Sequence, residues 1–263
     1  MRIIACLKLV ANPDVVELDL ASETLVNLQP VPDLPAAQLV EESLRLREKC
    51  GGDITALAVA PAAAETMLRN ALLYGADGAI RIWDDSLAGG DTFCMAQAIK
   101  PVVQRLGFDL ILCGSGSSDT GSEFMVPALA ALFDIPCATK IISLAAEENG
   151  GRITACKKLT RGRREEYSLP LPAVIGLEPG IHQPRYVAPF SRTYLEGRNK
   201  KVAVVEAAPD RSPAAPTGPV RAPSIGSLPE PACRPATRFP GSSVGNGTEI
   251  PPRFQGSRSC RPG

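Results

Sequence analysis

The sequence lacks the features that mark membrane proteins and nucleic-acid-binding proteins. Its 263 residues contain 28 Lys and Arg against 28 Asp and Glu, so no net charge would draw the protein to a nucleic acid or an anionic membrane. No uncharged apolar run approaches the roughly 20 residues that cross a bilayer. The first residues, MRIIACLKLV, do not form a cleavable signal pattern. We therefore expect a soluble protein that stays in the cytoplasm.

Cysteine and histidine do not occur in a pattern that would form a metal site. None of the eight cysteines belongs to a C-x-x-C pair. Cys6, Cys113 and Cys137 lie in or beside apolar runs, where cysteine usually acts as a small buried residue, so we expect reduced thiols with neither zinc nor disulfides. His182 is the only histidine. Without a carboxylate or thiol neighbour in the sequence, it is expected in a turn or an interface rather than as a catalytic base.

The chain does contain a regular alternation of apolar runs and helical periodicity. The apolar runs predict strands over 3–10, 53–60, 79–83 and 108–113. Amphipathic spacing predicts helices over 36–49, 61–74 and 91–106. Shorter strands that pair antiparallel are expected over 139–144, 152–158 and 165–169. Repeated βα units of this kind predict an α/β fold, a doubly wound and mainly parallel sheet with a short antiparallel extension.

The stretch after the last parallel run is rich in glycine and small hydroxyl residues. It reads CGSGSSDTGSEFM over 113–125, and ligands bind at the carboxyl ends of strands in such sheets, beside the next helix. Glycines allow close backbone approach and hydroxyls donate hydrogen bonds, as a phosphate site requires. The alternative is an ordinary loop in which Asp119, Thr120 or Ser122 caps the helix, and we expect Asp119 to act as a cap. No G-x-G-x-x-G or Walker loop is present, and no lysine follows the glycines.

The composition changes abruptly after Glu206. Residues 207–263 are dense in Pro, Gly, Ser and Arg and show no hydrophobic period, so they cannot bury enough apolar surface to form a core. We expect a folded domain over 1–206 and an irregular tail over 207–263, disordered or extended. An out-of-frame reading of the gene would produce a similar tail, and the sequence leaves that alternative open.

Several motifs occur in the order and spacing of one known family. ACLKLV is similar to V-K-x-V-P-D, ALLYGADGAI to A-L-A-M-G-A-D-x-A-I, and DLILCG to D-L-I-L-x-G. The loop and ALAALFDIP are similar to D-x-D-T-G-Q and L-A-x-x-L-G-I-P, and LPAVIGLEPGIHQPRY to L-P-A-V-x-T-V…I-N-x-P-R-Y. Over residues 1–206 the chain therefore resembles the beta subunit of electron transfer flavoproteins, the family that includes the FixA proteins.

The resemblance implies an adenine-nucleotide-binding, HUP-like fold that pairs with an alpha subunit. FAD would be shared with the alpha subunit, and the loop over 114–125 would bind AMP or, in the electron-bifurcating branch, a second FAD. Such a subunit carries electrons, as in fatty acid oxidation, between flavoprotein dehydrogenases of the acyl-CoA dehydrogenase type and a quinone-linked or ferredoxin- and NADH-linked partner. It is a carrier rather than a substrate-converting enzyme. The alternative is a stand-alone adenine-nucleotide-binding protein, regulatory or ATP-using.

Carried over by motif, the resemblance assigns the nucleotide contacts to Cys6, Asp33, Val59, Gly114, Ser115, Ser118, Asp119, Thr120, Gly121, Ser122, Phe124 and Met125. Asp33 stands where many relatives have asparagine. The family's glutamine after D-T-G is replaced by Ser122, or by Phe124 if the helices are aligned without a gap. Ser115 and Gly116 replace the usual lysine and glutamine, which lowers the positive charge expected for a phosphate. The segment after Tyr186 is implied to dock on a partner dehydrogenase through Phe190, Tyr194 and Leu195, and a plain surface connection is the alternative.

Overall fold

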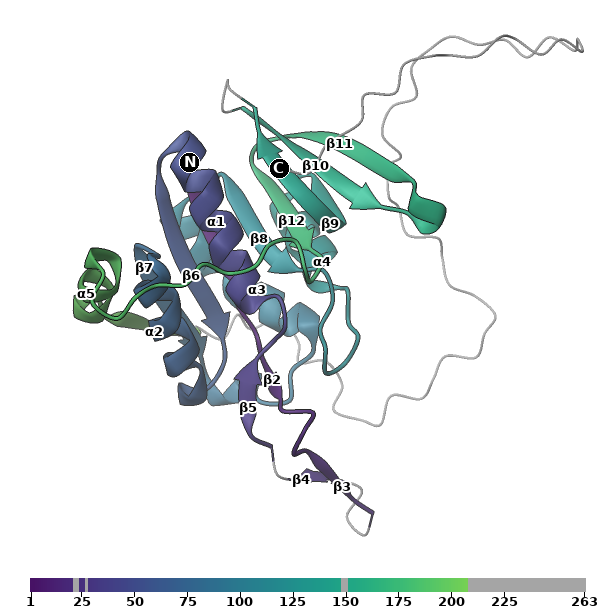
Figure 1. Ribbon diagram of the computed structural model, residues 1–263. Helices are drawn as coiled ribbons and strands as arrows, with labels where there is room; N and C mark the ends of the chain where they lie inside the picture. Colours follow the sequence, from purple (N-terminus) through teal and green to yellow (C-terminus); the bar gives the residue numbers. More distant parts are fainter. Residues whose placement is uncertain (21–23, 27, 148–150, 208–263) are drawn as a thin grey trace, which may run out of the picture. The chain divides into compact units, whose positions relative to one another are not determined.

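The computed structural model describes residues 1–20, 24–26, 28–147 and 151–207, which are built around one central sheet (Figure 1). The predicted tail lies outside the described residues from 208 onward. The sheet has the strand order β11-β10-β9-β12-β8-β1-β6-β7-β13. Its strands are β1 (Arg2–Cys6), β6 (Asp53–Val59), β7 (Gly78–Trp83), β8 (Leu110–Gly114), β9 (Cys137–Ala146), β10 (Arg152–Lys158), β11 (Arg164–Pro170), β12 (Ala173–Leu177) and β13 (Val202–Glu206).

The sheet is mainly parallel, as predicted. All neighbouring strands from β9 to β13 in this order run parallel, and β10 and β11 extend the sheet in antiparallel pairs. The chain passes from β1 outward to β6 and β7 and then returns to β8, on the other side of β1. The strand order therefore reverses between β1 and β8, and the carboxyl ends of strands at such a reversal border a ligand-binding crevice.

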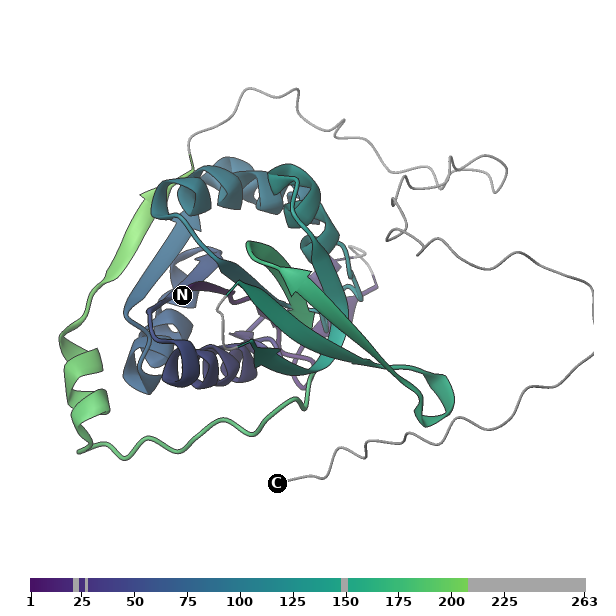
Figure 2. The ribbon, with the colours of Figure 1, turned by 90° about the horizontal axis from the view of Figure 1, so that it is seen from above.

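Helices cover both faces of the sheet (Figure 2). They are α1 (Ala36–Cys50), α2 (Glu65–Tyr74), α3 (Thr92–Leu106), α4 (Met125–Phe133) and α5 (Arg192–Asn199). Side chains of α1 and α2 pack in one core, those of α3 and α4 pack in the other, and α5 lies against α2. Leu110, Ile111 and Leu112 of β8 are fully buried because both layers cover this strand.

The predicted helices agree closely with the observed ones. The helix expected over 61–74 begins as a short 3₁₀ turn, η1 (Ala62–Ala64), and continues as α2. Further 3₁₀ turns are η2 (Asp85–Leu87) and η3 (Thr160–Gly162). The Asp91 carboxylate caps α3 by accepting a 2.8 Å hydrogen bond from the Cys94 N–H. Among the described residues, none of the helices combines the length and the apolar character that crossing a membrane would require.

The first predicted strand, over 3–10, was wrong in one respect, because the chain leaves the sheet after Cys6. The Leu7 N–H still donates to the Leu57 carbonyl at 2.7 Å, and β2 (Leu9–Ala11) then pairs antiparallel with β5 (Pro30–Pro32). A second small ribbon joins β3 (Glu17–Asp19) to β4 (Thr24–Val26). Apolar alternation continues through Leu7 and Leu9, so the pattern alone does not show where the strand changes partner. The change places Lys8 beyond the edge of the main sheet.

Candidate functional site

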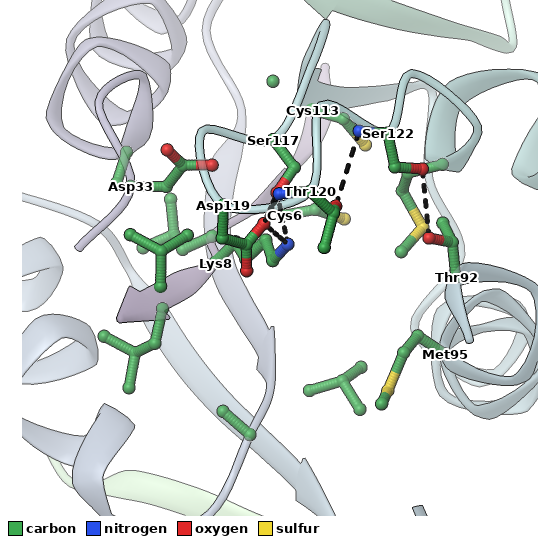
Figure 3. Close-up of a pocket in the computed structure, with 18 of the residues that line it drawn as sticks. Cys6, Lys8, Asp33, Thr92, Met95, Cys113, Ser117, Asp119, Thr120 and Ser122 are labelled. Atoms are coloured by element: carbon green, nitrogen blue, oxygen red, sulfur yellow. Dashed lines mark hydrogen bonds and ion pairs between the residues drawn. The ribbon is translucent and has the colours of Figure 1, made fainter. Parts of the chain in front are cut away.

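A cavity of about 770 Å³ lies at the carboxyl ends of β1, β6 and β8, where the strand order reverses (Figure 3). Its walls also include the β2–β5 ribbon and the first turns of α1 and α3. Cavities of this size are typical of small-molecule and cofactor sites. The structure thus provides a cavity at the edge of the sheet where the Gly/Ser-rich loop was expected to bind a ligand.

The cavity has an apolar side and a polar side. Apolar side chains of β6, α3 and α4 form one part of the lining, and they include Val59, Met95 and Met125. The polar part comes from the loop over 116–122, from Lys8 and from Asp33. A planar aromatic ring suits the first surface, and anionic or hydroxyl groups suit the second.

Two glycines show how the loop is held. A Cβ at Gly114 would lie 2.8 Å from Cγ of Pro35, so only glycine allows this approach of the loop to the start of α1. Gly121 has φ +65°, in the left-handed region, and its N–H donates to the Ser117 carbonyl at 2.8 Å. Ser115 is buried, and its Oγ accepts a 2.7 Å hydrogen bond from the Lys140 N–H. Ser115 therefore anchors the loop to β9 and does not line the cavity.

Lys8 supplies positive charge that the loop itself lacks. Its Nζ lies 2.7 Å from Oδ1 of Asp119 and also donates to Oγ of Ser117, which in turn donates to Asp119 (Figure 3). Burial raises the pKa of Asp119, but hydrogen bonds from Lys8 and Ser117 outweigh it and hold that pKa below its usual value. We call Lys8, Ser117 and Asp119 the loop cluster. Sequence reasoning missed Lys8 because it sought a lysine within the loop, although ACLKLV places one just after β1.

The expected cap is wrong: Asp119 does not cap α4. The helix begins at Met125 with Phe124 at the N-cap position, and no side chain caps it. Asp119 lies several residues upstream of that position and accepts hydrogen bonds from Lys8 and from the Thr120 N–H instead. Thr120 and Ser122 accept only long 3.4 Å hydrogen bonds within the loop, from the N–H groups of Ser122 and Phe124.

Asp33 faces the cavity from the turn before α1. Its side chain is buried, and Oδ1 accepts a 2.5 Å hydrogen bond from Oγ of Ser118 and a 2.8 Å bond from the Leu34 N–H. Ser118 therefore points toward Asp33 across 85 residues of sequence. This contact joins the loop to the start of α1.

The structure brings most of the predicted nucleotide-contacting residues to this cavity. Those that line it are Cys6, Asp33, Val59, Gly114, Asp119, Thr120, Ser122 and Met125. Those that do not line it are Ser115, Ser118, Gly121 and Phe124. Phe124 has an exposed side chain, and Gly121 shapes the loop from outside. Thr92 and Met95 of α3 line the cavity without having been predicted, and Oγ1 of Thr92 lies 3.2 Å from Oγ of Ser122.

A second polar cluster fixes the segment between β12 and α5 against α1. Nε of Arg185 lies 2.8 Å from Oε2 of Glu41, its Nη1 lies 2.5 Å from Oε1 of Glu48, and Nδ1 of His182 lies 2.8 Å from Oε2 of Glu42. We call these residues the helix cluster. Burial raises the pKa of Glu41, but hydrogen bonds from Arg185 and Arg45 outweigh it and lower that pKa to about 2. Burial raises the pKa of Glu42. His182 has no carboxylate neighbour in the sequence, but the fold brings Glu42 of α1 next to it.

The residues predicted to bind a dehydrogenase lie on and before α5. Phe190 is 92% exposed and Leu195 is also exposed, whereas Tyr194 is partly buried. Tyr186, which was not among the predicted partner contacts, is 86% exposed. The helix cluster thus holds a segment that presents aromatic side chains to solvent.

Comparison of the sequence with those of known proteins assigns the chain to a family. The family model described as "Electron transfer flavoprotein domain" matches residues 33–210. The electron transfer flavoprotein subunit beta of Thermoanaerobacterium thermosaccharolyticum is 29% identical over 80% of each chain. The corresponding subunit of Bacillus subtilis is 37% identical over 56% of each chain. The acryloyl-CoA reductase electron transfer subunit gamma of Anaerotignum propionicum is 32% identical over 53% of this chain and 54% of its own length. The chain belongs to the electron transfer flavoprotein family and is a member of its beta-subunit branch.

Proposed function

We propose that this chain is the beta subunit of a heterodimeric electron transfer flavoprotein that binds an adenine nucleotide in its cavity and completes a shared FAD site with an alpha subunit. The observation that carries the proposal is the cavity at the β1–β8 reversal, where Lys8 and the loop 114–125 face an apolar wall. Family membership supports the electron-transfer role. The nucleotide is AMP or a second FAD.

The lining of the cavity fits a nucleotide in its charge and polarity. The apolar surface that includes Val59, Met95 and Met125 suits an adenine ring, and Lys8 with the hydroxyls of Ser117 and Thr120 suits a phosphate. Lys8, which lies between β1 and β2, would take the place of the lysine that the loop lacks. A bound phosphate would accept hydrogen bonds from Lys8 in place of Asp119, so the loop cluster would rearrange when the nucleotide binds.

The nucleotide proposal can be tested directly on the purified complex. Denaturation followed by mass spectrometry of the released small molecules should yield AMP, or FAD in excess of the site shared with the alpha subunit. Added AMP or FAD should raise the melting temperature of nucleotide-free protein. If no adenine nucleotide is released and neither addition shifts the melting temperature, the loop is only a turn.

The heterodimer proposal concerns the flavin. Purified alone, this chain should lack stoichiometric FAD, because only part of the shared site belongs to it. Co-expressed with its alpha subunit, it should give a yellow heterodimer. A colourless monomer after co-expression with the correct alpha subunit would contradict the proposal.

The proposed electron donor is a flavoprotein dehydrogenase of the acyl-CoA dehydrogenase type, and the acceptor is a quinone-linked or ferredoxin- and NADH-linked partner. Phe190 is exposed on the segment that the helix cluster holds, and Leu195 is exposed on α5, which follows that segment and also carries Tyr194. Exposed aromatic and aliphatic anchors often dominate small interfaces. The Tyr194→Ala, Leu195→Ala double variant should slow electron transfer with the dehydrogenase and keep its FAD. Unchanged transfer rates across dehydrogenase concentrations would exclude this contact.

The alternative is a stand-alone adenine-nucleotide-binding protein, regulatory or ATP-using, that would bind its nucleotide in the same cavity. Such a protein would bind nucleotide with the same affinity alone and with an alpha subunit, and it would gain no flavin on co-expression.

A further inference from the structure

Two cysteines lie side by side on β1 and β8, the two strands between which the strand order reverses. β1 and β8 pair in parallel with Ala5 opposite Leu112, so the next residues, Cys6 and Cys113, stand opposite each other. Adjacent strands are about 4.8 Å apart, and opposite residues of a parallel pair point to the same face. Cys113 belongs to the core on the α3 and α4 side of the sheet, and Cys6 packs against that core. The two thiols therefore share one face.

Both cysteines line the cavity, and both carry free thiols. Cys6 is partly exposed, whereas Cys113 is only 2% exposed. Figure 3 shows both side chains in the cavity lining, with Met95 on α3. A reagent that enters the cavity can thus reach Cys6 first and Cys113 second.

The thiols interact with each other. A hydrogen bond between Cys6 and Cys113, together with burial, raises the pKa of Cys113 well above its usual value. A raised pKa makes a lone thiol a poor nucleophile toward alkylating agents. A soft centre that bonds to sulfur displaces the thiol proton on binding, so a high pKa does not prevent coordination. The pair is accordingly better suited to a centre that both sulfurs bind than to single alkylation.

We propose that Cys6 and Cys113 form a dithiol site for a thiophilic trivalent arsenical. Two As–S bonds form and the two As–O bonds of the hydrated arsenical R–As(OH)₂ break. The two thiol protons leave in two water molecules. Arsenic remains trivalent and sulfur is not oxidised, so no oxidant or reductant is required. Nothing in this site requires the nucleotide proposed above.

The test uses phenylarsine oxide on the full chain, with intact-mass measurement after incubation in excess monothiol. The wild-type protein should retain one arsenical that resists 2-mercaptoethanol and is removed by 1,2-ethanedithiol. Cys6→Ser and Cys113→Ser should each lose this resistant adduct. Cys50→Ser, which changes an exposed cysteine at the end of α1, should retain it.

Two results would overturn the proposal: a wild-type chain without a resistant adduct, or a Cys6→Ser variant that keeps one. Because Cys113 is buried and its variant can fail to fold, the Cys6→Ser variant and proteolytic mapping of the wild-type adduct decide the outcome without it. Mapping should find arsenic bridging the peptides that contain residues 6 and 113.

Discussion

The loop cluster and the helix cluster use the same chemistry in different surroundings. Each joins distant parts of the chain by ion pairs, Lys8 to Asp119 in the first and Arg185 to Glu41 in the second. The Lys8–Asp119 pair borders an open cavity, and Asp119 is 27% exposed. Glu41 is 3% exposed and already accepts hydrogen bonds from two arginines. A ligand in the cavity can therefore replace Asp119 as the partner of Lys8. The helix cluster lacks such access and only holds its segment against α1.

Removing the arginine of the helix cluster should have the largest effect on stability. Arg185→Ala leaves the buried Glu41 without its main partner, and we expect unfolding to become easier by about 2 kcal/mol. The loss stays below the value for a fully buried pair because Arg185 is partly exposed and Arg45 still contacts Glu41. Arg192→Ala, which breaks the exposed pair with Glu196, is the matched control and should change little. Equal midpoints of urea unfolding for the two variants would contradict the distinction.

Acid should weaken the helix cluster in a defined range of pH. The pKa of Glu41 is lowered in the folded protein from 4.5 to about 2, so this group stabilises the fold above pH 4.5 and loses that effect as the pH falls toward 2. Burial raises the pKa of Glu42 instead, so protonation of Glu42 as the pH falls favours the folded state. Urea unfolding between pH 5 and pH 2.5 should show a smaller fall in stability for Arg185→Ala than for the wild type. Parallel curves would mean that Glu41 is not the group responsible.

Changing the lysine of the loop cluster should affect ligand binding more than folding. Lys8→Met removes a charged donor from the proposed phosphate site, and the dissociation constant for AMP should rise roughly tenfold to hundredfold. Lys140→Met is the control, because Lys140 pairs with the exposed Glu123 outside the cavity. Titration calorimetry with AMP would measure both. A similar loss in the control would show that general surface charge, rather than Lys8, attracts the nucleotide.

The smallest effect is expected from the backbone of the loop. Gly121→Ala places a Cβ in open space but at φ +65°, which costs roughly 1 kcal/mol of stability. Gly116→Ala is the control, since its Cβ would meet only Cγ of Glu123 at 3.7 Å and its φ is not in the left-handed region. Thermal unfolding should separate the two variants by a few degrees. If Gly116→Ala is the less stable variant, the left-handed backbone at Gly121 does not determine how well the loop tolerates a side chain.

Local signals in the sequence determined how much of this could be predicted. The helix over 36–49 and the strand over 53–60 follow from periodicity that lies within one segment, and α1 and β6 confirm them. The contact of Arg185 with Glu41 spans 144 residues, and no short-range pattern encodes it. Lys8 and Cys6 reach the cavity because β1 lies beside β8, which follows from the strand order. The mistaken cap at Asp119 has the same origin, since its true partner, Lys8, follows β1 and is distant in the sequence.

The ion pair between Lys8 and Asp119 bears both on folding and on the proposed binding of a nucleotide. Because Asp119 neutralises Lys8 from within the cavity wall, the lysine does not oppose folding as an unpaired charge. In the nucleotide site proposed above, an incoming phosphate would have to displace this carboxylate from Lys8, so Asp119 would act as an internal competitor that lowers affinity and hastens release. On that proposal, the nucleotide would exchange with the surrounding pool rather than remain permanently enclosed.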